Sequence, residues 1–173
     1  DGNCVLLPLD YRNNYRPRTI TFCGSREKAL RATALDTCEI IDFSEEYPVW
    51  RYLRDDNDEI VHIHPSVHGA AILLPDGKVM AVGGNREARW DKPVYAVEVF
   101  NPQTDAWETD HAPIKVERGY HATALLLPDG RILISGTTPA SHRELRMETY
   151  SPYYLDGNPV RPEIKNIDSG NTA

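Results

Sequence analysis

Short apolar runs separated by polar turns recur along the chain, and one such unit is present twice. Residues 68–84 read HGAAILLPDGKVMAVGG, and residues 121–136, 53 positions further on, read HATALLLPDGRILISG. Each copy has two apolar runs around a Pro-Asp-Gly turn, in which proline presets φ and glycine takes the positive φ that re-enters the next strand. The pattern predicts two β-hairpins. Their strands are apolar on both faces, which is typical of strands covered on both sides.

A third strand is predicted after each hairpin. Residues 97–102 alternate polar and apolar side chains and are followed by Trp107, residues 38–43 are followed by Trp50, and residues 147–152 fit the same frame. The unit therefore has four strands in about 50 residues, which is the size of a kelch repeat.

The repeat predicts the architecture of the whole chain. A weaker copy of the hairpin lies at residues 4–24, with a longer polar loop in place of the tight turn. Units of this size cannot bury both faces alone and stack around an axis as propeller blades. We predict an all-β chain: a partial kelch-type β-propeller over residues 1–155, with about two complete four-stranded blades and parts of others. A generic antiparallel sandwich is the alternative. Residues 25–35 are expected to form either a helical turn or an excursion loop.

Composition and charge narrow the class of protein. The chain has 173 residues, of which 40% are hydrophobic and 26% charged, as in ordinary globular proteins. Its formal net charge of −7 argues against a nucleic-acid-binding surface. No run of about 18 apolar residues is present, so no membrane span is expected. The first residues, DGNC, have neither the basic nor the apolar region of a signal peptide, and the chain is expected to begin within a fold.

Three cysteines leave at least one thiol unpaired within the chain: Cys4, Cys23 and Cys38. Cys23 ends one apolar run and Cys38 begins the next, and sheet neighbours of this kind can lie at disulfide distance. A Cys23–Cys38 disulfide and two buried free thiols are both open interpretations.

Two other sets of polar residues suggest sites but favour simpler interpretations. His62 and His64 share one face of a strand, and His-x-His is a spacing found in metal sites. No further ligand follows at finger-like spacing, so solvated histidines on a blade edge are the favoured interpretation. Glu39, Glu98 and Glu148 recur at one position of the repeat. Recurrence indicates a structural hydrogen bond rather than the carboxylate pair of a glycosidase.

One segment of the chain resembles a known family. Residues 118–131 read RGYHATALLLPDGR, similar to the Tyr-His-Ser-x-x-Leu-Leu-Leu-Pro-Asp-Gly-Arg segment of galactose oxidase and glyoxal oxidase, the copper radical oxidases. Residues 148–155 resemble the segment that ends the propeller of that family. Residues 161–164 resemble the start of its C-terminal immunoglobulin-like domain. The resemblance covers about residues 1–164 and implies that residues 156–173 form a linker and the start of that second domain.

The resemblance also assigns roles to individual residues. It implies that Tyr120 is an axial copper ligand and that His121 is an equatorial one, and imidazole suits copper. Neighbouring strand residues point to opposite faces, so both can reach one metal only where the chain bends, and Gly119 is expected to permit the bend. His68 aligns with His121 in the repeat and is expected to line the substrate opening without binding copper.

The same resemblance sets the expected function. The family also needs a cysteine-crosslinked tyrosine and a second histidine, and neither is identifiable here; Cys23 and Cys38 resemble cysteines that occur earlier in the family. The parent protein is expected to oxidise a small alcohol, aldehyde or carbohydrate while reducing O2 to H2O2. The isolated chain is expected to hold half a copper site, to lack turnover, and to need the remaining blades and the C-terminal domain. The family is commonly extracellular, which implies secretion. The alternative is a non-catalytic kelch propeller that binds carbohydrate or protein.

Overall fold

The structure is all-β, as the hydrophobic pattern predicts. It is a computed structural model that describes residues 2–25, 33–87, 92–110, 112–137, 144–157 and 159 of the 173. Within these ranges the only helical elements are two single 3-10 turns, η1 (Tyr11–Asn13) and η2 (Tyr153–Leu155). No helix in the described part of the chain is long and apolar enough to cross a membrane.

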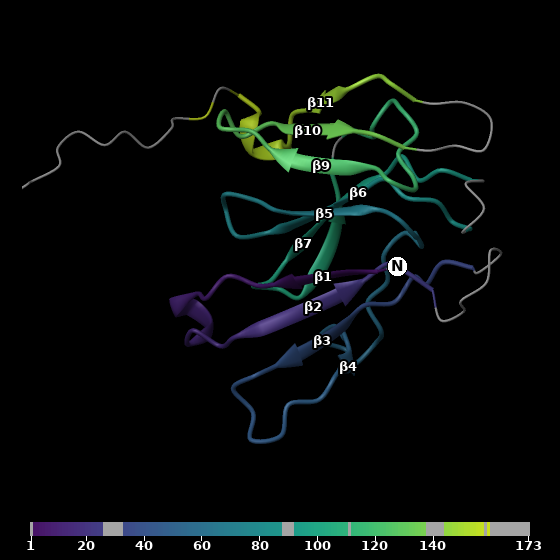
Figure 1. Ribbon diagram of the computed structural model, residues 1–173. Coiled ribbons are helices and arrows are strands. Elements are labelled where there is room, and N and C mark those ends of the chain that lie inside the picture. Colours follow the sequence, from purple (N-terminus) through teal and green to yellow (C-terminus); the bar gives the residue numbers. More distant parts are fainter. Residues whose placement is uncertain are drawn as a thin grey trace, which may run out of the picture.

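In the part of the chain that the structure describes, eleven strands form three separate antiparallel sheets, and in each sheet the spatial order of the strands follows the sequence (Figure 1). The first sheet consists of β1 (Asn3–Leu6), β2 (Arg18–Phe22), β3 (Glu39–Asp42) and β4 (Arg51–Tyr52). The second consists of β5 (Ala70–Leu73), β6 (Val79–Val82), β7 (Val97–Asn101) and β8 (Ala106–Thr109). The third consists of β9 (Thr123–Leu126), β10 (Ile132–Ser135) and β11 (Glu148–Tyr150). Each sheet is thus built from one continuous stretch of chain.

The two predicted hairpins are present, and their turns have the predicted chemistry. The backbone nitrogen of Gly77 donates to the oxygen of Leu74 (3.0 Å), and that of Gly130 donates to the oxygen of Leu127 (2.9 Å). Gly77 and Gly130 have φ values of +86° and +87°, in the region that glycine enters without steric cost. The weaker copy is also a hairpin, because β1 pairs with β2 across the longer loop that contains η1.

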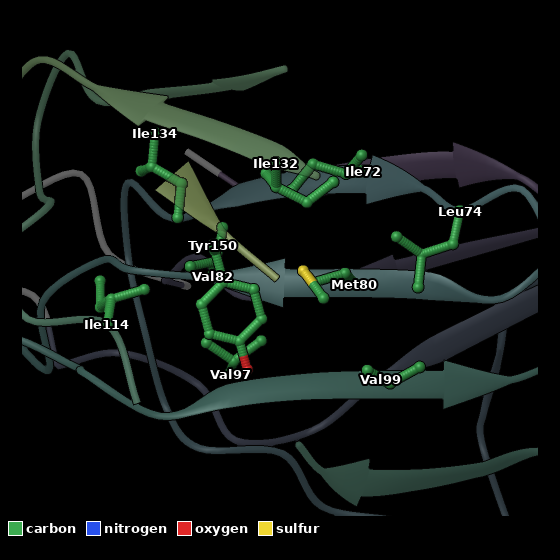
Figure 2. Packing of buried hydrophobic residues seen from close by; sticks show 10 residues of the cluster. All are labelled: Ile72, Leu74, Met80, Val82, Val97, Val99, Ile114, Ile132, Ile134 and Tyr150. Carbon is green, nitrogen blue, oxygen red and sulfur yellow. The ribbon is translucent and has the colours of Figure 1, made fainter. Parts of the chain in front are cut away.

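Side chains of the second sheet fill the space on both of its faces. Met80 and Val82 of β6 belong to a core shared with the third sheet (Figure 2), whereas Val79 and Ala81 belong to a core shared with the first sheet. All four are buried, because alternate strand residues point to opposite faces and both faces are covered. The uninterrupted apolar run 79–82 is therefore explained by the position of β6 between two hydrophobic cores.

Two of the three recurring glutamates, Glu98 and Glu148, bind the segments that lead into their own sheets. Both carboxylate oxygens of Glu98 accept the backbone N–H of His64, each at 3.1 Å. Glu148 accepts the backbone N–H groups of Lys115 (2.7 Å) and Val116 (3.2 Å). The same position in two sheets thus accepts hydrogen bonds from backbone N–H groups, as the recurrence indicates.

The cysteines are free thiols, so the Cys23–Cys38 disulfide is not formed in this structure. The indole nitrogen of Trp107 donates to the sulfur of Cys38 (3.2 Å), and the hydroxyl of Ser66 donates to the sulfur of Cys23 (2.9 Å). Cys23 has a left-handed φ of +60°, which takes it out of the extended strand geometry that the sequence pattern suggests. Each sulfur therefore has its own donor instead of the other sulfur.

Because the thiol of Cys38 is buried, we expect the protein to lose stability at alkaline pH. Burial raises the pKa of this thiol from its ordinary value of 9.0 to about 12, despite the indole donor. Below about pH 9 the Cys38 thiol keeps its proton in both the folded and the unfolded protein. Between about pH 9 and pH 12 the thiol loses its proton in the unfolded protein but keeps it in the folded one. The free energy of unfolding should therefore fall by up to about 1.4 kcal/mol per pH unit from about pH 9 upward. Urea unfolding between about pH 8 and pH 10.5 measures this slope, and Cys38→Ala should flatten it. Equal slopes in both proteins would contradict the prediction.

Two expectations concern residues that the structure does not describe. Residues 26–32, most of the segment expected to be a helical turn or a loop, lie outside the described ranges. So do residue 158 and residues 160–173, which include nearly all of the predicted linker and second domain. These two assignments stay predictions.

Candidate functional site

Tyr120 and His121 are the two central residues of a tight turn that leads into β9. The backbone nitrogen of Ala122 donates to the oxygen of Gly119 (2.9 Å), which closes the turn. His121 has a φ of +65°, as the third residue of a type II turn requires, and histidine is among the side chains that enter this region most often. The rings of Tyr120 and His121 stack, with centroids 3.8 Å apart and planes at 29°. The two neighbouring side chains therefore lie together instead of on opposite faces.

The bend arises at a different residue from the one expected. Gly119 lies outside the left-handed region, and it is His121 that turns the backbone. Gly119 is needed for space, because a Cβ added there would lie 2.1 Å from the side-chain oxygen of Asn85. Its backbone nitrogen also donates to the hydroxyl of Thr137 (2.9 Å), in a buried position. Gly119 is thus wedged between residues that follow β6 and β10.

His68 of the second sheet lies against the same pair. Its φ of +64° nearly equals that of His121, so the repeat extends to the backbone conformation before each hairpin. The His68 ring meets the Tyr120 ring edge-on, with centroids 4.9 Å apart and planes at 64°. We call Tyr120, His121 and His68 the aromatic trio.

The aromatic trio combines one partly buried side chain with two that solvent reaches. Tyr120 is 38% exposed and His121 is exposed, so an ion or small molecule has access to both rings. Burial lowers the pKa of His68, and the positive charges of the N-terminus and of His121 lower it further. In the described part of the chain, no group of three or more His, Cys, Asp or Glu side chains is placed to hold a metal ion.

Glycines that follow the second strand of each hairpin allow the backbone to pass close to the turn. A Cβ on Gly136 would lie 2.6 Å from the oxygen of His121, and one on Gly83 would lie 2.7 Å from the oxygen of Arg118. The sequence pattern identifies these glycines only as the ends of strands. Their equivalent positions in the two repeats give no sign that Gly83 lies against Arg118 and Gly136 against His121.

His62 and His64 do not converge on a common site. The Nδ1 atom of His62 lies 3.1 Å from a carboxylate oxygen of Asp36, and that of His64 lies 3.0 Å from one of Glu98. Each imidazole has its own carboxylate partner. Neither histidine lies within a strand of the three sheets, so the two do not share a strand face as expected.

Two hollows lie away from the aromatic trio. One, of about 310 Å³, lies beside Cys23 and Glu39, and the other, of about 210 Å³, lies between Asp10, Asp76 and Asn101. Neither is lined by a member of the trio. Two of its three side chains, those of Tyr120 and His121, are exposed.

Comparison with known proteins gives consistent matches. The family model described as the glyoxal oxidase N-terminus matches residues 1–154. An aldehyde oxidase of Vitis pseudoreticulata is 28% identical over 94% of this chain and 34% of its own length. An aldehyde oxidase of Arabidopsis thaliana is 26% identical over 77% of the chain and 23% of its own length. A galactose oxidase of Gibberella zeae is 31% identical over 54% of the chain and 15% of its own length. The chain thus spans about a third or less of these relatives.

Proposed function

This chain belongs to the glyoxal and galactose oxidase family, and from that premise we propose that it supplies part of the copper site of a longer oxidase. The stacking of Tyr120 on His121 at 3.8 Å is the observation that carries the proposal. It places a phenol and an imidazole from neighbouring residues at one exposed point. The resemblance assigns the ligand roles to these same two residues.

The donor set of the turn fits a copper ion. Imidazole suits copper, and the phenol of Tyr120 offers an oxygen beside it. Both side chains are exposed to solvent. Copper, when bound, supplies one-electron redox chemistry. The remaining ligands would come from parts of the longer protein beyond this chain.

The three sheets would then be blades of a kelch-type propeller that the longer protein completes. Both hairpins start from the same left-handed histidine conformation, at His68 and His121. This repetition brings the mouths of the second and third sheets to the same end of the structure. His68, whose ring lies against that of Tyr120, would line the opening through which substrate reaches Tyr120.

We propose an aldehyde as the substrate class of the longer protein. The two aldehyde oxidases match 94% and 77% of this chain, whereas the galactose oxidase matches 54%. The balanced reaction converts an aldehyde, water and O2 into a carboxylic acid and H2O2. The substrate loses two electrons and O2 gains them. The family resemblance also supports secretion of the longer protein.

Peroxide formation tests the proposal. The full-length protein, loaded with copper, should form H2O2 with small aldehydes, and a peroxidase-coupled assay measures it. Primary alcohols and galactose serve as the comparison substrates. The 173-residue chain alone, treated in the same way, should form no peroxide. Absence of peroxide and of bound copper in the full-length protein would favour the non-catalytic propeller instead.

A further inference from the structure

Arg118 is the largest of the fully buried side chains, with an exposed fraction of 1%. Its Nη1 atom donates to the backbone oxygen of Gly136 (3.0 Å), and its Nη2 atom donates to that of Arg146 (2.9 Å). In the antiparallel register of β10 and β11, Ile134 faces Glu148. Gly136 and Arg146 are therefore the facing residues two positions beyond that last pair. The guanidinium fills the gap where the two strands separate.

This burial is costly, which indicates that the residue has a specific role. Within the described ranges its guanidinium has backbone carbonyls as hydrogen-bond partners and forms no ion pair with a carboxylate. A buried cation without a carboxylate partner is expensive unless carbonyl oxygens compensate for its lost hydration. An apolar side chain would fill the same space at lower cost.

The backbone of Arg118 connects the third sheet to the second. Its oxygen accepts the backbone N–H of Gly84, which follows β6, at 2.5 Å. Arg118 is thus bound through its side chain to the end of the third sheet and through its backbone to the end of the second. The next residue, Gly119, donates to Thr137, and the two residues after it are Tyr120 and His121. These hydrogen bonds hold the backbone of Arg118 and Gly119, where the turn begins.

We propose that Arg118 is a positioning residue, which sets the Tyr120–His121 turn between the second and third sheets so that the two rings stack. Both hydrogen bonds of its guanidinium described above are to backbone oxygens, so it acts through the turn and not on a ligand. The expected effect of Arg118 on copper affinity rests on the proposed function. Its expected effect on the stacking of the Tyr120 and His121 rings does not.

The test compares three variants of the full-length protein. Arg118→Met removes the guanidinium but keeps an apolar stem, and Arg118→Lys keeps the charge but not the planar fork that spans two carbonyls. Arg18→Met is the matched control. Arg18 also joins two sheets, because it bonds both carboxylate oxygens of Asp105 (2.9 and 2.8 Å) and the oxygen of Pro102 (2.5 Å), and its side chain is 12% exposed.

Two measurements separate positioning from general stability. In the copper-free protein, NMR with selectively labelled Tyr and His reports the contact between the Tyr120 and His121 rings. Competition with a chelator reports the affinity for copper. Arg118→Met and Arg118→Lys should lose the ring contact and lower the copper affinity about tenfold or more, the size typical of residues that orient ligands. Arg18→Met should keep both.

Each outcome decides the inference. Retention of the ring contact in Arg118→Lys, with a copper affinity equal to that of Arg18→Met, would overturn it, and so would loss of the ring contact in Arg18→Met. If Arg118→Met does not fold, Arg118→Lys carries the test. If the unmodified protein binds no copper, the proposed function fails, but the ring contact still decides whether Arg118 positions the turn.

Discussion

Replacement of His121 by alanine should lower the affinity of the full-length protein for copper by on the order of 100-fold or more, because a ligand is lost and not only its orientation. Tyr120→Phe should leave the metal bound, since the imidazole stays, but it should change the copper optical and spin-resonance spectra. Chelator competition and the two spectroscopies measure these effects. Both variants should also abolish peroxide formation.

His62→Ala is the matched control for the loss of an imidazole. Its ring lies beside Asp36 and is 58% exposed, and it is not part of the aromatic trio. Its removal should change the copper affinity by less than about twofold, because the metal does not contact it. If His62→Ala weakens copper binding as much as His121→Ala does, the metal is not bound at the turn.

Replacement of Gly119 by alanine should destabilise the protein by about 1–3 kcal/mol, the usual cost of overpacking a filled interior. The added methyl group would lie 2.1 Å from the side-chain oxygen of Asn85, whose residue is fully buried. The strain should be relieved by displacement of the turn, so copper affinity should fall as well. Urea unfolding and chelator competition measure the two effects.

A double-mutant cycle checks the cause of this strain. Within the described ranges neither polar atom of the Asn85 side chain has a hydrogen-bond partner. Asn85→Ala therefore removes the obstructing oxygen without breaking a hydrogen bond of that side chain. In the Asn85→Ala background, Gly119→Ala should cost much less than it does alone. An equal cost in both backgrounds would show that the strain does not arise from this contact.

The sequence predicts those parts of the fold whose causes are local. The Pro-Asp-Gly turns at 75–77 and 128–130 determine two hairpins by their own backbone preferences, and the apolar run 79–82 shows that its strand is covered on both faces. The repeat adds the role of Glu98 and Glu148, since one position in two sheets implies one contact. These predictions needed no information about how the sheets pack.

Features that depend on packing between sheets were not predictable in the same way. The pattern places Cys23 and Cys38 on neighbouring strands, but it does not show that Ser66 and Trp107 approach their sulfurs. It also assigned the bend to Gly119, whereas the left-handed residue is His121. Distant segments decide both features, so no local pattern contains them.

The candidate site likewise contains residues that the sequence identifies and residues that it does not. The sequence brings Tyr120 and His121 together through their motif, and the repeat adds His68. Arg118 and Asn85 were missed, because an arginine and an asparagine in a polar-looking segment give no sign that they are 1% and 0% exposed. Burial of this kind becomes visible only when the second and third sheets are placed side by side.

The position of copper in a crystal structure of the loaded full-length protein, located by anomalous scattering, decides whether the turn binds the metal. We expect an ion about 2 Å from a ring nitrogen of His121, with the phenol oxygen of Tyr120 directed at the same ion. An ion held at His62 or His64, or a copper site elsewhere with the aromatic trio unchanged, would contradict it.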